Sequence, residues 1–186
     1  MIHQRFVPEL QKLRRHHYHA ERVAFPSPGD SALFLPAEAS GVQLEIAARI
    51  SFAASAHSVG RFGLRVLAND ASSEYTEVGF QRGVHDRVYV DRRRSSGGVR
   101  DADVRAGPWL NASAATQVQL HLIVDRSIVT LIVDNSTTLS LWVHPTTPRE
   151  STRVALFVDS REGEGEGVAG LRAEMIDVWQ LASPAH

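Results

Sequence analysis

Strand-like hydrophobic periodicity runs through most of this 186-residue chain. Apolar residues alternate with polar ones, or run on for the length of one strand, in Val42-Gln-Leu-Glu-Ile46, Phe62-Gly-Leu-Arg-Val66 and Leu120-His-Leu-Ile-Val124. Successive side chains of a β-strand point to opposite faces, so a period of two predicts strands with a buried face. No helical pattern that could serve as a crossover connection lies between these segments. The chain is therefore expected to form antiparallel sheets.

The number and spacing of the strands predict two packed sheets. Turn-forming residues at 69–70, 96–98 and 134–136 separate short strands, and no repeat of constant length is present. About nine such strands around a single core are typical of an all-β antiparallel β-sandwich of the jelly-roll or concanavalin-like kind. Besides the three segments above, strands are expected at 77–80, 88–90, 129–133, 139–143, 154–158 and 174–181.

The first 25 residues lack this strand pattern. Pro8 suits a first helical turn, and Val7, Leu10 and Leu13 recur at a spacing of three, which predicts a short helix over 8–15. Three histidines within His16-His-Tyr-His19 follow it. No carboxylate cluster accompanies them in the sequence, so we expect a solvated linker and no metal site. The predicted organisation is a linker segment with a short helix at 1–25 and a β-sandwich domain at 26–186.

Composition excludes several classes of function. The net charge of -1 and a hydropathy pattern without an apolar run of membrane-spanning length predict neither a nucleic-acid nor a membrane partner. The chain has no cysteine, which rules out disulfides, thiolate metal sites and thiol catalysis. Nucleophile-elbow, phosphate-loop and dinucleotide-binding motifs are also missing from the sequence, so no cofactor is expected.

Two short polar motifs at predicted strand ends are candidate sugar contacts. Asp125 and Arg126 lie between two apolar strands, and Asp91 and Arg92 begin the run Asp91-Arg-Arg-Arg94. Carboxylate and guanidinium groups match neighbouring sugar hydroxyls in a bidentate way. The competing structural interpretation is that Asp125 accepts hydrogen bonds from its turn, and that the arginines pair with nearby aspartates.

The three tryptophans offer a surface on which a sugar ring could stack. Trp142 and Trp179 lie within apolar alternation and are expected in the core. Trp109 follows Gly107-Pro108 in a predicted loop, which makes it the exposed candidate. A carbohydrate site would therefore consist of Asp91, Arg92, Trp109, Asp125 and Arg126.

These segments together resemble the C-terminal β-sandwich domain of glycoside hydrolase family 32, the invertases, inulinases and levanases. Residues 1–14 are similar to the segment that leaves the catalytic propeller of those enzymes. Val88-Tyr-Val-Asp-Arg92, Leu122-Ile-Val-Asp-Arg-Ser127 and Val178-Trp-Gln-Leu181 follow in the family's order. The resemblance implies a non-catalytic accessory domain of a β-fructofuranosidase that is secreted or vacuolar. It also implies that the segment from Asp91 to Arg94 lies against the propeller, where it could form ion pairs.

The sequence departs from the family at its catalytic and hairpin motifs. The family's Asn-Asp-Pro and Arg-Asp-Pro motifs have no match here, because Asn69-Asp-Ala71 and Arg100-Asp-Ala102 lack the proline, and a Glu-Cys pair cannot occur without cysteine. In the hairpin, Thr130 and Ile132 stand where the family has Glu and Phe. Catalysis by this chain alone is therefore not expected.

Three functions remain open on the sequence. The first is an accessory domain that stabilises a family 32 catalytic propeller in cis or mediates dimerisation; such a domain would expose an apolar face and self-associate as a homodimer. The second is a free-standing module that binds β-fructan or sucrose. The third is a hydrolase in its own right, which would need a pair of carboxylates among Asp86, Asp91, Asp125, Asp134 and Asp159.

Overall fold

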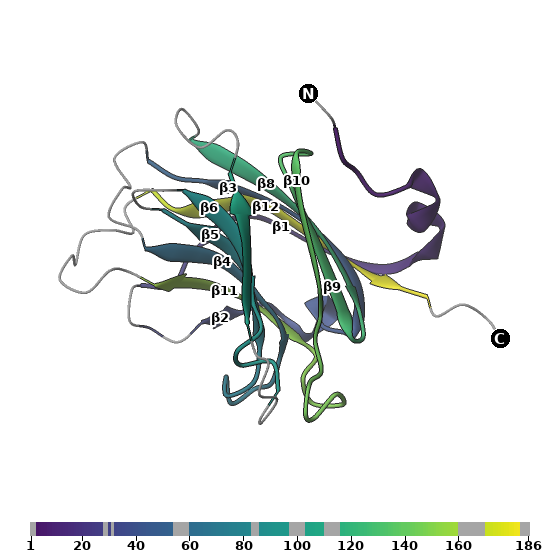
Figure 1. The fold of residues 1–186 in the computed structure, drawn as a ribbon. Coiled ribbons are helices and arrows are strands. Elements are labelled where there is room, and N and C mark those ends of the chain that lie inside the picture. Colours follow the sequence, from purple (N-terminus) through teal and green to yellow (C-terminus); the bar gives the residue numbers. More distant parts are fainter. Residues whose placement is uncertain are drawn as a thin grey trace.

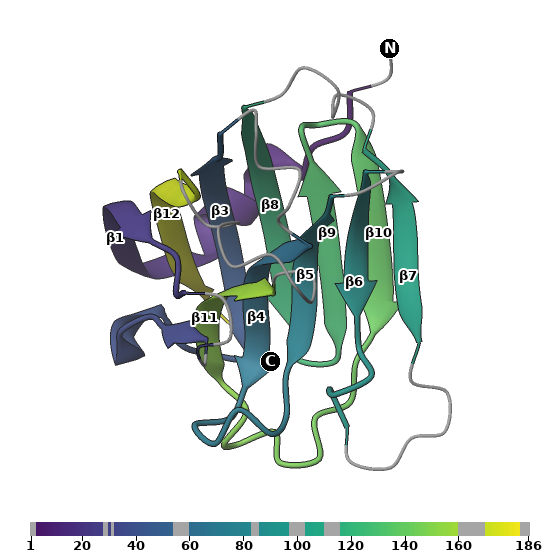
Figure 2. The ribbon, with the colours of Figure 1, turned by 90° about the vertical axis from the view of Figure 1, so that its left-hand side faces the viewer.

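The computed structural model describes residues 3–27, 30, 32–53, 60–82, 86–96, 103–109, 116–159 and 170–182. It contains two six-stranded sheets, with strand orders β1-β12-β3-β8-β9-β10 and β2-β11-β4-β5-β6-β7. Figures 1 and 2 show the two sheets packed face to face. The strands are β1 (Arg14–Ala24), β2 (Leu33–Phe34), β3 (Gln43–Ser51), β4 (Arg61–Ala68), β5 (Thr76–Gln81), β6 (Arg87–Asp91), β7 (Val104–Pro108), β8 (Gln117–Asp125), β9 (Ile128–Val133), β10 (Thr137–Trp142), β11 (Arg153–Asp159) and β12 (Arg172–Leu181).

The predicted antiparallel β-sandwich is confirmed. All recorded strand pairings are antiparallel, and the apolar positions of the period-two segments face the space between the sheets. Burying these side chains contributes roughly 1.5 to 3 kcal/mol each relative to exposure. The central strands β3, β4 and β8 supply fully or almost fully buried residues, namely Leu44, Ile46, Ala48, Ile50, Phe62, Leu64, Val66, Leu120, Leu122 and Val124.

The N-terminal region differs from the prediction. The expected helix is a short 3-10 helix, η1 (Pro8–Leu13), and residues 14–24, which we placed in the linker, form the edge strand β1. Its apolar residues Tyr18 and Val23 pack on the core but are five positions apart, so no alternation marks the strand. Pairing with β12 makes this segment a strand. The sandwich therefore includes the histidine-containing segment.

The segment before β1 lies across the outer face of the first sheet. It is the purple chain outside the sandwich in Figure 1. The backbone amide of Gln4 donates to the carbonyl of Asn135 at 2.7 Å, and the rings of Phe6 and His121 meet edge to face at 4.7 Å. The amide of Ala182 donates to Leu13 O at 2.8 Å. These contacts cover part of the polar face of that sheet.

The second helix, η2 (Ala37–Ala39), is a single 3-10 turn. Within the described ranges, no helix is long and apolar enough to cross a lipid bilayer.

Candidate functional site

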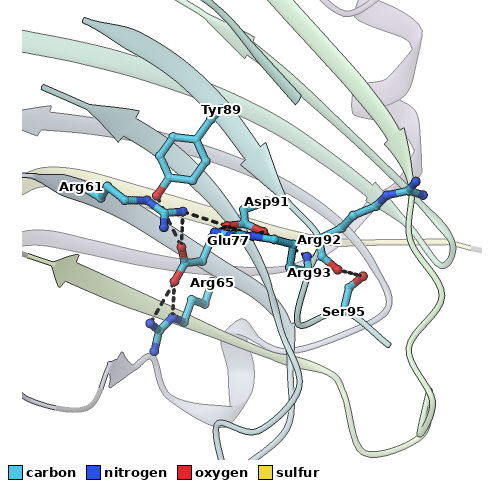
Figure 3. Close-up of polar contacts among 8 residues, drawn as sticks. All are labelled: Arg61, Arg65, Glu77, Tyr89, Asp91, Arg92, Arg93 and Ser95. Carbon is cyan, nitrogen blue, oxygen red and sulfur yellow. Dashed lines mark hydrogen bonds and ion pairs between the residues drawn. The ribbon is translucent and has the colours of Figure 1, made fainter. Parts of the chain in front are cut away.

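A cluster of arginines and carboxylates covers the outer face of the second sheet. Arg61 and Arg65 on β4 and Glu77 on β5 alternate with core residues, so they point away from the core. Arg61 Nη2 lies 2.8 Å from Glu77 Oε2, and Arg65 Nη2 lies 2.9 Å from Glu77 Oε1. The neighbouring strand β6 adds Asp91, which accepts a 3.1 Å hydrogen bond from Arg61 (Figure 3). One buried carboxylate thus joins two strands, and a second extends the network to a third.

Tyr89 and Arg93 complete the cluster. The Arg61 guanidinium lies 4.3 Å above the ring of buried Tyr89, and Arg93 binds Asp91 with Nη2 to Oδ2 at 2.6 Å and Nε to Oδ1 at 3.0 Å. Burial tends to raise the pKa of Asp91, but hydrogen bonds from Arg93 and Arg61 outweigh it, so the pKa is lowered. Burial raises the pKa of the Tyr89 phenol well above its ordinary value. These shifts favour the charged form of Asp91 and the neutral form of Tyr89.

An open pocket of about 530 Å³ lies over this cluster. Guanidinium, carboxylate and phenol groups in one pocket could hydrogen-bond several hydroxyls or an anion. However, Glu77 and Asp91 already accept hydrogen bonds from two arginines each, so a ligand would have to compete with these pairs. The pocket is lined by Arg61, Arg65, Tyr75, Glu77, Asp91, Arg93, Arg94 and Asp159.

Of this cluster, Asp91 and the arginines that follow it were identified from the sequence. Arg61, Arg65 and Glu77 were missed. A signal was available, because Arg65 is a charged residue inside the predicted strand 62–66, Arg61 directly precedes that strand, and Glu77 begins the predicted strand 77–80. Charged residues in the middle of a strand need partners when a further layer of chain covers them. Here Ala32 and Phe34 pack on Tyr89, Ala155 and Phe157 in a small second apolar cluster.

Asp125 and Arg126 lie at the exposed hairpin between β8 and β9. Asp125 accepts a 3.0 Å hydrogen bond from Gln43 Nε2, its neighbour across the β3–β8 pairing. Arg126 adopts a left-handed conformation with φ of 52°, and its amide donates to Val42 O at 2.7 Å. Arg126 also borders a mainly apolar pocket of about 360 Å³ with Val143, Pro145 and Pro148 among its other walls. This hairpin presents its two polar residues beside an apolar surface.

The five predicted sugar contacts do not form one site. Figure 3 shows Arg92 pointing away from the arginine–carboxylate cluster, and it binds Asp103 at 2.7 Å and Trp142 O at 2.9 Å. Trp109 was predicted to be exposed, and this is wrong. It is 4% exposed and packs among core aromatics, while its Nε1 donates to Asp134 at 2.9 Å. A core side chain cannot stack on a sugar.

The other tryptophans also differ from expectation. Trp142, predicted in the core, is 60% exposed. Trp179 is partly buried on the outer face of the first sheet, where the His17 ring stacks on it at 4.7 Å and Arg14 lies 3.8 Å from its ring centroid. Among the three tryptophans, Trp142 is therefore the one whose side chain is exposed.

Buried Glu45 anchors the N-terminal part of the chain to the first sheet. Arg14 donates to both of its oxygens, at 2.6 and 2.7 Å, and His121 Nε2 lies 2.8 Å away. Burial tends to raise the pKa of Glu45, but the hydrogen bonds and charges of Arg14 and His121 lower it to about 2. The charged carboxylate is thus more stable in the folded state than in the unfolded chain.

This shift predicts a specific loss of stability in acid. A depressed carboxyl pKa stabilises the fold fully above the unfolded value of about 4.5, and this contribution is lost as the pH falls toward about 2. It amounts to at most about 3 kcal/mol at neutral pH. Urea unfolding from pH 6 to pH 2.5 should show a shallower acid loss for Glu45→Gln than for the unchanged chain. Parallel curves for the two proteins would contradict the assignment.

Three of the five carboxylates considered for hydrolysis have structural partners. Asp86 lies 3.6 Å from Arg82, Asp134 binds Trp109 and the amide of Gln119, and Asp91 is held by arginines. A general acid needs a raised pKa, whereas that of Asp91 is lowered. The partial motif at 100–102 lies outside the described residues. These observations give no support to a hydrolase built from this chain alone.

Comparison with known families agrees with this architecture. The family model described as "Glycosyl hydrolases family 32 C terminal" matches residues 9–180. The chain belongs to this family. The match covers the C-terminal domain of family 32 and not its catalytic domain. No curated protein matches the sequence significantly.

Solved structures share the fold at low sequence identity. Fructan 1-exohydrolase IIa from Cichorium intybus superposes with a TM-score of 0.81 at 15% identity, over 97% of this chain and 38% of that chain. A β-fructofuranosidase from Aspergillus kawachii gives 0.68 at 24% identity, over 87% of this chain and 27% of that one. Sucrose-6-phosphate hydrolase from Lactobacillus gasseri gives a TM-score of 0.68 at 17% identity, over 97% of this chain and 31% of that chain. The present chain thus spans less than two-fifths of the length of each of these three enzymes.

Proposed function

We propose that this family 32 domain is the accessory β-sandwich of a β-fructosidase and stabilises a catalytic propeller in cis. The observation that carries the proposal is the match to the family's C-terminal model over 9–180, in a chain that covers 27 to 38% of the three solved enzymes named above. The substrate, sucrose or a β-fructan, would bind and react on the propeller. This division of labour agrees with the structural pairing of Asp86, Asp91 and Asp134.

The proposed contact surface is the end of the sandwich that carries Trp142. Arg92 on the second sheet donates to Trp142 O, and the exposed guanidinium of Arg93 follows directly in the chain. The Trp142 ring stacks near that of exposed His144, with centroids 6.4 Å apart. An exposed aromatic pair beside Arg92 is suited to a protein interface. A homodimer of the isolated chain would use the same surface.

The test begins with the coding sequence upstream of Met1, which should encode a catalytic domain in the same reading frame. The longer product should release fructose from sucrose or inulin. Replacing Trp142 by alanine should lower the melting temperature of the longer product by several degrees, because a buried interface aromatic is lost. Leu33→Ala, at an exposed position on β2, is the matched control and should have little effect. An upstream region without a catalytic domain would contradict the proposal.

The pocket of about 530 Å³ supports a second candidate, a sugar-binding module. Isothermal titration of the chain with levan, inulin oligosaccharides, sucrose and fructose separates the two functions. The accessory domain should give no saturable heat. Saturable heat that is lost in Arg94→Ala would instead place a ligand in this pocket, and loss in Arg126→Ala would place it at the β8–β9 hairpin. Released fructose would support the hydrolase.

A further inference from the structure

Two histidines and an aspartate meet on the outer face of the first sheet. His17 and His19 are two positions apart on β1, so their side chains lie on the same face. On the adjacent strand β12, Asp177 is the direct cross-strand partner of His19. The pairing of an N-terminal and a C-terminal strand therefore adds a less exposed carboxylate to the two imidazoles.

The three side chains converge on one point. His17 Nε2 lies 2.7 Å and His19 Nδ1 lies 2.8 Å from the same oxygen, Asp177 Oδ1. One potential ligand atom from each residue lies within 4.8 Å of the others. The imidazoles are 43% and 45% exposed, whereas the carboxylate is 12% exposed, so an ion could reach the group from solvent.

We propose that His17, His19 and Asp177 form a binding site for a divalent transition-metal ion, with zinc as the preferred occupant. Imidazole nitrogens with one carboxylate oxygen suit zinc, copper or nickel better than calcium or magnesium, which prefer oxygen ligands. Three protein ligands leave one tetrahedral position for water or for a group from a partner. The site is separate from the arginine–carboxylate cluster, which lies on the other sheet.

The surroundings orient both rings as metal ligands. While Nδ1 of His19 faces Asp177, its Nε2 lies 3.5 Å from Glu21 Oε1. A carboxylate on the far nitrogen is the usual outer-shell partner of a metal-bound histidine. The His17 ring is stacked on Trp179 with an angle of 7° between the planes, which leaves Nε2 directed at Asp177. These contacts define which nitrogen of each ring faces the proposed ion.

Metal binding requires the two imidazole nitrogens to move away from the oxygen that they now share. Ligand atoms bound to one tetrahedral zinc ion lie about 3.3 Å apart, given bond lengths of about 2.0 to 2.1 Å. The present separations of 2.7 and 2.8 Å are hydrogen-bond distances. An ion would displace the shared protons, and the facing nitrogen of each ring would move about half an ångström away from Asp177 Oδ1. Rings that are nearly half exposed have room for this movement.

The experiment is calorimetric titration of the 186-residue chain with ZnCl₂, using protein that carries no histidine tag. We expect one equivalent of zinc to bind saturably, and His19→Ala and Asp177→Asn each to weaken binding at least tenfold. His16→Ala is the matched control, because His16 is exposed on the same strand but is not a ligand. This variant should bind zinc like the unchanged chain.

Two results would overturn the proposal. One is the absence of saturable binding to the folded, unchanged chain. The other is equal loss of affinity in His16→Ala and His19→Ala, which would indicate diffuse binding to a histidine-rich surface. Circular dichroism of each variant separates loss of a ligand from loss of the fold. Substitution with Co²⁺ gives an independent readout, since a four-coordinate site produces visible absorption that the Asp177→Asn variant should lose.

Discussion

Replacing Gly79 by alanine is expected to destabilise the domain by about 3 kcal/mol or more, because its Cβ would overlap the neighbouring backbone. Gly79 on β5 lies directly opposite Gly63 on β4. A Cβ added at Gly79 would lie 2.2 Å from the carbonyl oxygen of Phe62 and 3.1 Å from Gly63 Cα. Backbone atoms in the middle of a sheet cannot move aside without breaking ladder hydrogen bonds. The two glycines therefore allow β4 and β5 to approach closely.

Equilibrium unfolding in urea measures this effect, and Gly107→Ala on β7 is its control. A Cβ at Gly107 would first meet a methyl group of Thr137 at 3.3 Å, which is a side-chain atom that can shift. We expect a cost below about 1 kcal/mol for this control. Similar unfolding midpoints for the Gly79 and Gly107 variants would show that the close approach of β4 and β5 is not essential.

Replacing Glu77 by alanine should destabilise the domain by about 3 kcal/mol, because it leaves two partly buried guanidinium groups without their shared carboxylate. Glu77 accepts hydrogen bonds from both Arg61 and Arg65 while its side chain is 9% exposed. Removing one member of a buried network leaves the desolvation cost of the others uncompensated. The pocket over this face would also lose one wall.

The matched control is Asp70→Ala, which breaks an ion pair at the surface. Asp70 lies 2.6 Å from Arg153, but its side chain is 81% exposed. Solvent screens such pairs, and the expected cost is at most about 1 kcal/mol. Urea unfolding of both variants at neutral pH compares the two situations. Equal costs would mean that the Glu77 network is no more important than a surface ion pair.

The fold could be predicted from the sequence because burial follows the period of two. In β8, Leu120, Leu122 and Val124 alternate with polar or partly exposed residues, and they occupy the core as expected. The same rule also applies to Trp142 on β10. Leu139, Leu141 and Val143 face inward, so Trp142 between the last two had to face outward. Its apolar neighbours suggested a core position, whereas its parity along the strand predicted exposure.

The candidate sites were less predictable because their members come from distant parts of the sequence. Asp91 is adjacent to Arg92 in the chain, yet its partners are Arg61 and Arg93, and Arg92 points elsewhere. Trp109 lies just beyond β7, and the packing of that end of the sandwich places it against the core. Proximity in sequence thus did not predict the groups that these residues contact.

The sequence by itself determined the fold class and the family, because both depend on local patterns of hydrophobic and polar residues. Only the tertiary structure decided which charged and aromatic side chains meet. Asp177 lies 158 positions from His19, and they become neighbours through the register of β1 on β12. Register is set by the summed packing and hydrogen bonding of whole strands. No single segment contains that information, so the proposed metal site and the arginine–carboxylate cluster emerge only in the folded chain.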